Sequence, residues 1–410
     1  MSMRISTSWS YQQSLSTMLS QQAALAGTQN QVSSGKRINV ASDDPAGAAQ
    51  ALAIDHTLSA NNQYTTNIGT ANTRLSTEST TLDSITDQLD SARSLALQAI
   101  NGVLAPEDRA SIATNLQQIR AQLMQLANTA DANGDALFSG TSSTKTPFIQ
   151  NADGSVSYAG TDGQMMMSIG SGLQVAIGDA GSGIFMNNPN GNGTFVAAAG
   201  SANTGSLIVG ASSVTDPATY QAGMTAGGGY TISFDAAGNW SAADAAGNPV
   251  LDPATGTPVG GPYTAGDAIS FNGMTVAMTG TPAAGDTVTV GPSQNQDIFS
   301  TINNMISALQ GTGSDADLTN AMNRQIESLD QTQASVTNTQ VLAGSRLGVL
   351  DQQGQSYADL SVTYQDALSG VQDADPAATI SQLSLQSAAL QASQQVFAKV
   401  QTMTLFDYIK

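Results

Sequence analysis

Apolar residues recur at every seventh position along a stretch in the last quarter of the chain. The register runs from Met322 to Val371 through eight apolar residues, and no proline interrupts it. A strict seven-residue apolar repeat is typical of a helix whose stripe faces another helix over many turns. At ~1.5 Å per residue this helix is about 75 Å long, too long for a compact core to cover. We therefore expect it to have helical partners from elsewhere in the chain.

Apolar residues at three- and four-residue spacing predict further helices on both sides of a central region. The second helix has a start signal, because Ser42-Asp43-Asp44-Pro45 places capping side chains and a proline in its first turn. Asn133-Gly134 predicts the end of the third helix. The predicted helices cover residues 11–33, 43–100, 106–133, 297–310 and 376–403.

The central region has a different composition. From Thr146 to Asn323 there is no lysine, arginine or histidine, and glycines and prolines separate short alternating runs. Runs such as 168–177, 230–234 and 287–290 predict strands joined by hairpin turns. The aspartates of this region lack the spacing of a calcium-binding loop, so we expect them to be turn residues.

These elements predict an α+β multidomain fold, in which a long helical bundle or coiled coil from both termini encloses a β-rich inserted domain. Residues 1–42 with 372–410 form terminal assembly helices, which are disordered in the monomer and become a coiled coil on assembly. A helical domain comprises residues 43–140 and 296–371. Residues 141–295 form a variable outer domain rich in strands.

Charge and composition exclude several functions. The 410 residues carry a formal net charge of −19, which disfavours a nucleic-acid partner because the phosphate backbone would repel it. There is no cysteine, and the single histidine, His56, lies in a predicted helix and is expected on its surface. We find no membrane span, no secretory signal, no catalytic group, no metal site and no cofactor site, and we expect the protein not to be an enzyme.

The two ends of the chain share an unusual surface. Only 10% of all residues are charged, and residues 1–41 contain no acidic residue. The predicted helix 11–33 has one apolar face and one face rich in glutamine and asparagine, and helix 380–403 has the same character. An exposed helix face normally carries Glu and Lys, so an amide-rich face favours packing against copies of itself. The alternative is that the whole protein is simply poor in charge.

We expect the two terminal helices to pair and to become ordered on assembly, because terminal segments that bury little surface alone are commonly disordered. Lys36, Arg37 and Asn39, between the first two helices, are candidates for polar contacts between subunits, with ordinary loop solvation as the alternative. The apolar candidates for assembly and partner binding are Leu15, Leu19, Leu25, Val32, Leu383, Leu390, Phe397, Val400, Leu405 and Phe406.

Several motifs resemble a known family. Residues 33–39 with residues 42–47 are similar to the signature of the bacterial flagellin superfamily. Residues 137–141, 280–286 and 403–409 resemble the hook–filament junction branch of that superfamily more than filament flagellins. Residues 146–279 match no pattern of the family, as expected for its variable outward-facing domain.

The resemblance implies a structural adaptor of the bacterial flagellum. It implies a ring of subunits that joins hook-associated protein 1, on the hook side, to the flagellin filament. It also implies type III export without cleavage to an extracellular position, and an export chaperone that binds the carboxy-terminal helix between Leu383 and Phe406. An amphipathic helix that docks into apolar surroundings explains both assembly and chaperone binding.

Two other structural roles stay open at this point. A filament flagellin is the nearer alternative, although the ending Leu405-Phe406-Asp407-Tyr408-Ile409 argues against it. A secreted adhesin or fibre protein with a coiled-coil stalk is the other, but it would oligomerise by parallel heptads alone and would not need paired amphipathic ends.

Overall fold

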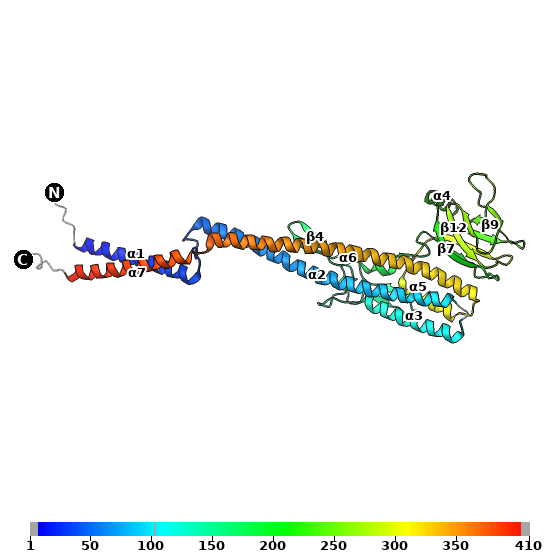
Figure 1. Cartoon of the computed structure of the whole chain (residues 1–410), viewed down its shortest axis with the longest axis horizontal. Helices are drawn as coiled ribbons and strands as arrows, with labels where there is room; N and C mark the ends of the chain where they lie inside the picture. The colour runs from blue at the N-terminus through cyan, green and yellow to red at the C-terminus, as the bar shows by residue number, and fades with distance from the viewer. Residues whose placement is uncertain (1–6, 102–103, 403–410) are drawn as a thin grey trace, which may run out of the picture. The chain divides into compact units, whose positions relative to one another are not determined.

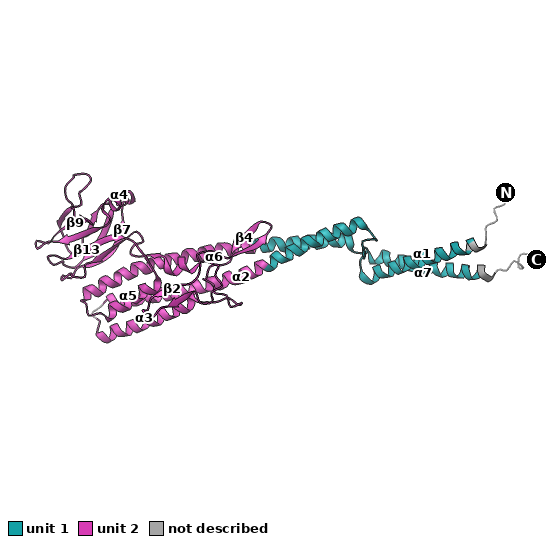
Figure 2. Cartoon of the chain, turned by 180° about the vertical axis from the view of Figure 1, so that it is seen from behind, with its two compact units in different colours: residues 1–66, 352–410 teal, residues 67–351 magenta. Residues whose placement is uncertain are grey.

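The computed structural model describes residues 7–101 and 104–402 (Figure 1). The chain forms two compact units, one of residues 1–66 with 352–410 and the other of residues 67–351 (Figure 2). The helices are α1 (Thr7–Ser34), α2 (Pro45–Ile100), α3 (Pro106–Ala127), α4 (Pro217–Gly227), α5 (Ile298–Gln310), α6 (Asp315–Gln372) and α7 (Pro376–Thr402), with a π-helical turn η1 (Ser182–Met186).

The predicted fold class is confirmed, since long helices from both ends of the chain enclose a strand-rich region. Helix α6 covers the whole seven-residue repeat. The first five members of the repeat, from Met322 to Leu350, are buried, whereas Tyr357, Tyr364 and Val371 are half-buried. The repeat therefore predicts the helix along its full length, and its burial is deepest in the first half.

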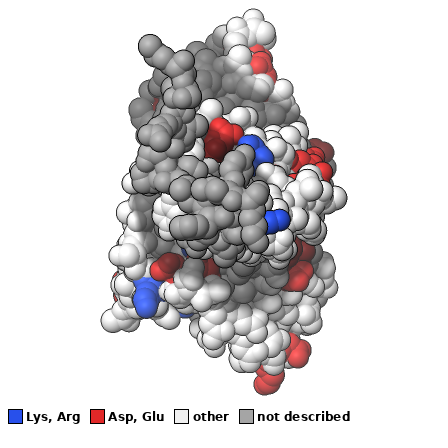
Figure 3. All heavy atoms as spheres, turned by 90° about the vertical axis from the view of Figure 1, so that its left-hand side faces the viewer, with Lys and Arg blue, Asp and Glu red and all other residues white. Residues whose placement is uncertain are grey.

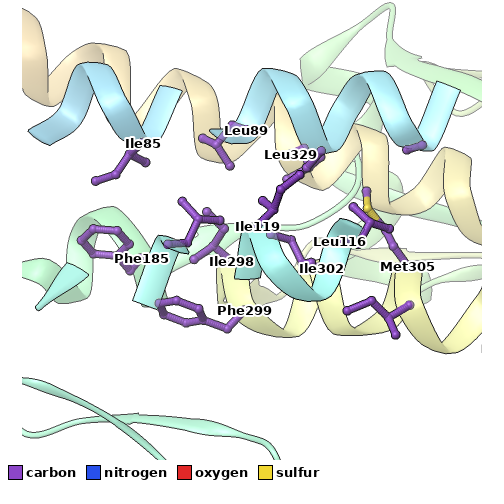
Figure 4. Packing of buried hydrophobic residues seen from close by; sticks show 14 of the residues in the cluster. Ile85, Leu89, Leu116, Ile119, Phe185, Ile298, Phe299, Ile302, Met305 and Leu329 are labelled. Carbon is purple, nitrogen blue, oxygen red and sulfur yellow. The ribbon is translucent and has the colours of Figure 1, made fainter. Parts of the chain in front are cut away.

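The core of the second unit lies among helices α2, α3, α5 and α6 (Figure 4). Helix α3 packs along α5, and Ile85 and Leu89 of α2 face them. Phe185 of η1 lies in this core between Phe148 and Phe299, with ring centroids 5.0 and 6.3 Å away. Burial of such apolar stripes provides most of the stability of a helical bundle.

The strands are antiparallel throughout the described residues. They are β1 (Phe148–Gln150), β2 (Val156–Tyr158), β3 (Met166–Gly170), β4 (Leu173–Ala176), β5 (Asn188–Pro189), β6 (Phe195–Ala199), β7 (Ile208–Val214), β8 (Tyr230–Phe234), β9 (Asn239–Asp244), β10 (Gly260–Pro262), β11 (Ala268–Phe271), β12 (Met274–Thr279), β13 (Thr287–Pro292) and β14 (Asn295–Gln296). The larger sheets have the orders β10-β9-β8-β13-β6 and β11-β12-β7.

These two sheets share a second hydrophobic core. Alternate residues of β8 are buried, with Ile232 opposite Val288 of β13. Alternate residues of β12, beginning at Met274, point into the same core. This alternation is the period-2 pattern of a sheet with one covered face, and it confirms the strands predicted at 230–234 and 287–290.

Two features of the fold depart from the sequence-based prediction. Helix α3 ends at Ala127, so the predicted end near Asn133 is wrong. The side chain of Asn128 instead pairs with the backbone of Phe148, accepting from its N–H at 2.9 Å and donating to its carbonyl at 2.9 Å. Helix α4 was not predicted, although Asp216 caps its first turn and Pro217 begins it.

Several aspartates of the strand-rich region are turn residues, as the sequence predicts, whereas Asp179 pairs with Arg346 and Asp286 is buried. Asp235 accepts from the backbone N–H of Ala237 and Asn239, and Asp244 accepts in the same way from Ala246 and Asn248. The side-chain donors of Asn239 and Asn248 hold the pKa of these two carboxyls below the ordinary value.

Helix α6 holds the edges of both large sheets with buried polar side chains. Asn320 accepts from the N–H of Val209 at 2.7 Å and donates to the carbonyl of Leu207 at 2.8 Å, as a neighbouring strand would. Arg324 donates to the carbonyls of Ala197 on β6 and Gly210 on β7. These contacts satisfy backbone groups that an edge strand would otherwise leave unpaired.

Candidate assembly surface

Helices α1 and α7 lie side by side in opposite directions within the first unit (Figure 1). The rings of Tyr11 and Phe397 lie 5.2 Å apart at one end of the pair. At the other end Lys36 forms a β-bridge with Asp373. The two contacts define one antiparallel register, which places Leu25 at the level of Leu383.

The interior of this helix pair contains polar residues. Thr28 and Thr379 are buried, and each hydroxyl donates to a backbone carbonyl four residues earlier in the chain. Among the described residues, the side-chain oxygens of Gln21 and Gln386 are buried without a hydrogen-bond partner. An unpaired buried polar atom costs free energy, so the contact of α1 with α7 is weaker than an all-apolar one.

Large apolar side chains cover the solvent-facing sides of both helices. No charged residue occurs in 7–35 or 376–398. On the visible face in Figure 3, charged side chains form separate spots on a mostly uncharged surface. The exposed apolar residues of the pair are Trp9, Tyr11, Leu15, Leu19, Val32, Ile380, Leu385 and Val396. Large apolar side chains exposed on two paired, uncharged helices are a candidate interaction site.

A groove of about 320 Å³ lies between the two helices. Met18, Val396 and Phe397 supply its apolar lining, and its other residues are small or carry amides and hydroxyls. The groove therefore suits an apolar side chain from another helix whose polar groups are also uncharged.

The segment between α1 and α2 is closed by Arg37. Its guanidinium donates to the carbonyl of Val371 at 2.7 Å and pairs with Asp44 at 3.2 Å. The backbone N–H of Arg37 donates to the carbonyl of Gln372 at 2.7 Å, and the N–H of Ala374 donates to Gly35 at 2.9 Å. These bonds attach the segment to the end of α6 and the turn that follows it.

Asp43 and Asp44 organise the start of α2. Asp43 accepts from the N–H groups of Asn39 and Val40, both at 3.0 Å. Asp44 accepts from the N–H of Gly47 at 2.9 Å, and this bond together with Arg37 lowers its pKa. Asp44 therefore caps the first turn of α2, whereas Asp43 binds the segment that precedes the helix.

The described residues show no sign of a metal site or of a membrane span. No group of three or more His, Cys, Asp or Glu side chains there could hold a metal ion. None of the described helices is both long and apolar enough for a membrane span. His56 is exposed on α2, as the sequence predicts.

Comparisons with known proteins give two kinds of relative. The bacterial flagellin N-terminal helical region family matches residues 5–143. Flagellar hook-associated protein 3 of Salmonella typhimurium is 37% identical over 183 residues, 45% of this chain and 57% of that protein. Flagellin FlaB1 of Treponema pallidum is 33% identical over 150 residues, 36% of this chain and 52% of that protein. The chain thus spans little more than half the length of these curated relatives.

A solved structure decides between them. The crystal structure of flagellar hook associated protein-3 from Legionella pneumophila is 30% identical, with a TM-score of 0.69, and the match covers 78% of this chain and 98% of that one. The chain belongs to the flagellar hook-associated protein 3 family. Membership confirms the resemblance to the flagellin superfamily and to its junction branch.

The structure of this family member places most of the predicted assembly residues on the helix pair, and their role in assembly stays a prediction. Leu25, Leu383, Leu390 and Phe397 are half-buried between the helices, whereas Leu15, Leu19 and Val32 are exposed. Arg37 and Asn39 make hydrogen bonds within the chain. Leu405, Phe406 and the side chain of Val400 lie outside the described residues.

Sequence reasoning missed the polar residues inside the pair. Gln21 and Thr28 are seven residues apart and alternate with Met18, Leu25 and Val32 at three- and four-residue spacing. The heptad pattern could therefore have placed both between the helices. Trp9 and Leu385 were missed because they lie on the exposed side of the pair.

Proposed function

We propose that this protein is the junction adaptor of a bacterial flagellum, a structural subunit without enzymatic activity. A layer of subunits joins hook-associated protein 1 on the hook side to the flagellin filament. The observation that carries the proposal is the helix pair of α1 and α7, with its exposed apolar side chains and its lack of charge between residues 7 and 35 and between 376 and 398.

Assembly supplies what the single chain lacks. Trp9, Leu19 and Leu385 are 58%, 58% and 69% exposed, so burying them against neighbouring subunits is favourable by about 25 cal/mol per Å² of apolar surface. Contacts between unlike surfaces of identical subunits generate a ring or helical layer.

We assign a separate role to each of three parts of the chain. Residues 1–42 with 372–410 are the assembly helices, residues 43–140 with 296–371 are the helical domain, and residues 141–295 are the variable outer domain. Leu15, Leu19, Leu25, Val32, Leu383, Leu390, Phe397, Val400, Leu405 and Phe406 bind neighbouring subunits. Lys36, Arg37 and Asn39 add polar contacts at the segment between α1 and α2.

The carboxy-terminal helix also binds a partner before assembly. An export chaperone covers the region from Leu383 to Phe406 until the chain leaves the cell by type III export, without cleavage, for the extracellular junction. The absence of cysteine supports this route, because a disulfide would hinder passage of an unfolded chain through a narrow channel.

A filament flagellin remains the second candidate, supported by the family match to residues 5–143. The near-complete match to a hook associated protein-3 structure favours the adaptor. A parallel coiled-coil fibre has less support, because the terminal helices pair in antiparallel register within one chain.

Deletion of the gene tests the adaptor role. We expect completed hooks without filaments, with monomeric flagellin lost to the medium, and restoration by the intact gene. A variant with Leu19→Ser and Leu385→Ser, which alters exposed residues only, should fail to restore filaments although the protein folds. Normal filaments in the deletion strain would refute the proposal, and absent hooks would indicate an earlier role.

A further inference from the structure

A buried ionic cluster joins α2 and α6 to the segment that follows strand β4. The guanidinium of Arg346 donates to both carboxylate oxygens of Asp179, at 2.8 and 2.9 Å. Arg74 of α2 pairs with Asp131 and also donates to the carbonyl of Ala136 at 3.1 Å. Each arginine thus has its own aspartate, and the two pairs together carry no net charge.

Glu78 brings a further carboxyl into this cluster. It lies on α2, one turn after Arg74, and is 0% exposed. Its Oε1 accepts from the backbone N–H of Asp179 at 3.1 Å. Its Oε2 is buried and has no hydrogen-bond partner among the described residues. A buried carboxylate with one donor is poorly stabilised, whereas a protonated carboxyl needs less from its surroundings.

The charged groups around Glu78 do not compensate for its burial. Removal from water and the carboxylate of Asp179 raise its pKa to about 7, although the Asp179 N–H, Arg346 and Arg74 act in the opposite direction. Both arginines are already committed to aspartates. Ionisation of Glu78 therefore adds one unbalanced negative charge to a buried site.

The hydrogen bond that Glu78 accepts from the Asp179 N–H is one attachment of the segment that continues strand β4, and the bonds from Arg346 to the Asp179 carboxylate are another. Residues 175–179 are buried, and the β3–β4 hairpin before them is also held by the amide of Asn67, which donates to Ser168 at 2.7 Å. The hairpin carries the exposed apolar side chains of Met166 and Leu173. Loosening of residues 177–179 would therefore remove one of the attachments of this apolar hairpin and leave the bond from Asn67.

We propose that Glu78 is a proton-dependent latch, which holds residues 177–179 and the β3–β4 hairpin on α2 when its carboxyl is protonated and loosens them when it is ionised. The closed state binds the proton more tightly than the open state, where the carboxyl is solvated. Closure is therefore strongest at low pH, weakens as the pH rises from about 4.5 to about 7, and then stays constant.

The composition of the chain allows a direct test. Its only glutamates are Glu78, Glu107 and Glu327. In the intact protein labelled with ¹³C-glutamate, a carboxyl signal that Glu78→Gln removes should titrate at about pH 7. Glu107→Gln, which removes an exposed glutamate, is the matched control and should leave this signal in place. A Glu78 signal that titrates at the ordinary glutamate value of 4.5 would overturn the proposal.

Amide hydrogen exchange then tests the latch itself. After correction for the intrinsic rate, protection of residues 166–179 should fall by up to about tenfold per pH unit between about 4.5 and 7. Glu78→Gln should make this protection independent of pH, and Glu107→Gln should leave the fall unchanged. Protection that does not vary with pH in the unmodified chain would overturn the latch, as would a Glu78→Gln variant that loses protection at every pH. If Glu78→Gln does not fold, the unmodified chain alone decides between these outcomes.

Discussion

Tyr11 and Phe397 stand near opposite ends of the chain, and their rings lie 5.2 Å apart. Tyr11 is still 46% exposed, and its neighbours on the helix pair include the exposed Leu15 and Val396. Contacts of such large sequence separation form slowly, because closing the chain costs entropy. The exposure of these side chains shows that the helix pair is only partly buried in a single subunit, and a neighbouring subunit can cover the rest.

Two adjacent residues of α7, Val396 and Phe397, allow the pairing of α1 with α7 to be tested separately from assembly. Phe397→Ala removes the contact with Tyr11 and should weaken the helix pair of the free subunit by about 0.5–1.5 kcal/mol beyond the loss of buried area. Val396 is 63% exposed, so Val396→Ala should leave the free subunit unchanged and reduce assembly. Helicity of the free chain and the yield of assembled layer measure both effects. Equal loss of helicity in the two variants would contradict the assignment.

Arg37 fixes the segment between α1 and α2 through Val371 and Asp44. Arg37→Ala should increase proteolytic cleavage between residues 35 and 44 several-fold, because the carbonyl of Val371 loses its donor and Asp44 loses its cation. Arg37→Lys should restore the charge but not both bonds, so it should give an intermediate rate. Lys36→Ala, which leaves these bonds intact, is the matched control. Cleavage that is unchanged in Arg37→Ala would show that the segment is held by other contacts.

Arg324 and Arg93 allow a buried ion pair within α6 to be compared with an exposed ion pair between α2 and α6. Arg324→Ala leaves Glu327 without its cation and the carbonyls of Ala197 and Gly210 without their donor, and should destabilise the second unit by about 3–5 kcal/mol. Arg93 and Asp330 are 41% and 46% exposed, so Arg93→Ala should change stability by less than about 1 kcal/mol. Denaturant unfolding measures both, and similar midpoints would contradict the role of Arg324 as an edge clamp.

The two cores of the second unit should respond to pH in opposite directions. The raised pKa of Glu78 makes the helical core most stable below about pH 4.5, and its contribution is lost as the pH rises to about 7. The lowered pKa values of Asp216, Asp235 and Asp244 stabilise the turns of the strand-rich core above pH 3.8, and this contribution is lost as the pH falls further. In a Trp9→Phe variant, Trp240 fluorescence reports the strand-rich core and far-ultraviolet circular dichroism reports the helices. Parallel changes of the two signals with pH would contradict this prediction.

The long elements follow from local patterns in the sequence. The seven-residue repeat predicts α6, and the start signal at Ser42 to Pro45 predicts α2, because both patterns depend on neighbours along the helix. The alternation at 230–234 predicts β8 for the same reason. Residues 148–186, predicted as part of the strand-rich region, contribute Phe148 and Phe185 to the helical core. Such burial depends on which elements meet, which alternation cannot show.

The polar contacts between distant segments could not be predicted from the sequence. From the sequence alone, Glu78 cannot be told apart from an exposed helix residue. Its burial depends on Asp179 and Arg346, which come from distant segments of the chain. Arg324 gives no local sign that it binds two strand edges. The apolar candidates at the ends were easier to identify, because their spacing alone indicates a helix with one apolar face. Which of them face the partner helix and which face outward depends on the register set by Tyr11 and Phe397.

Fluorescence of Trp9 tests the central claim, that the exposed apolar side chains of α1 and α7 become buried among neighbouring subunits. Trp9 is 58% exposed in the single chain, and a Trp240→Phe variant makes it the only tryptophan. When this variant assembles with flagellin and hook-associated protein 1, we predict a blue shift of its emission and loss of access to a soluble quencher. Emission and quenching that stay unchanged while the layer forms would contradict the account.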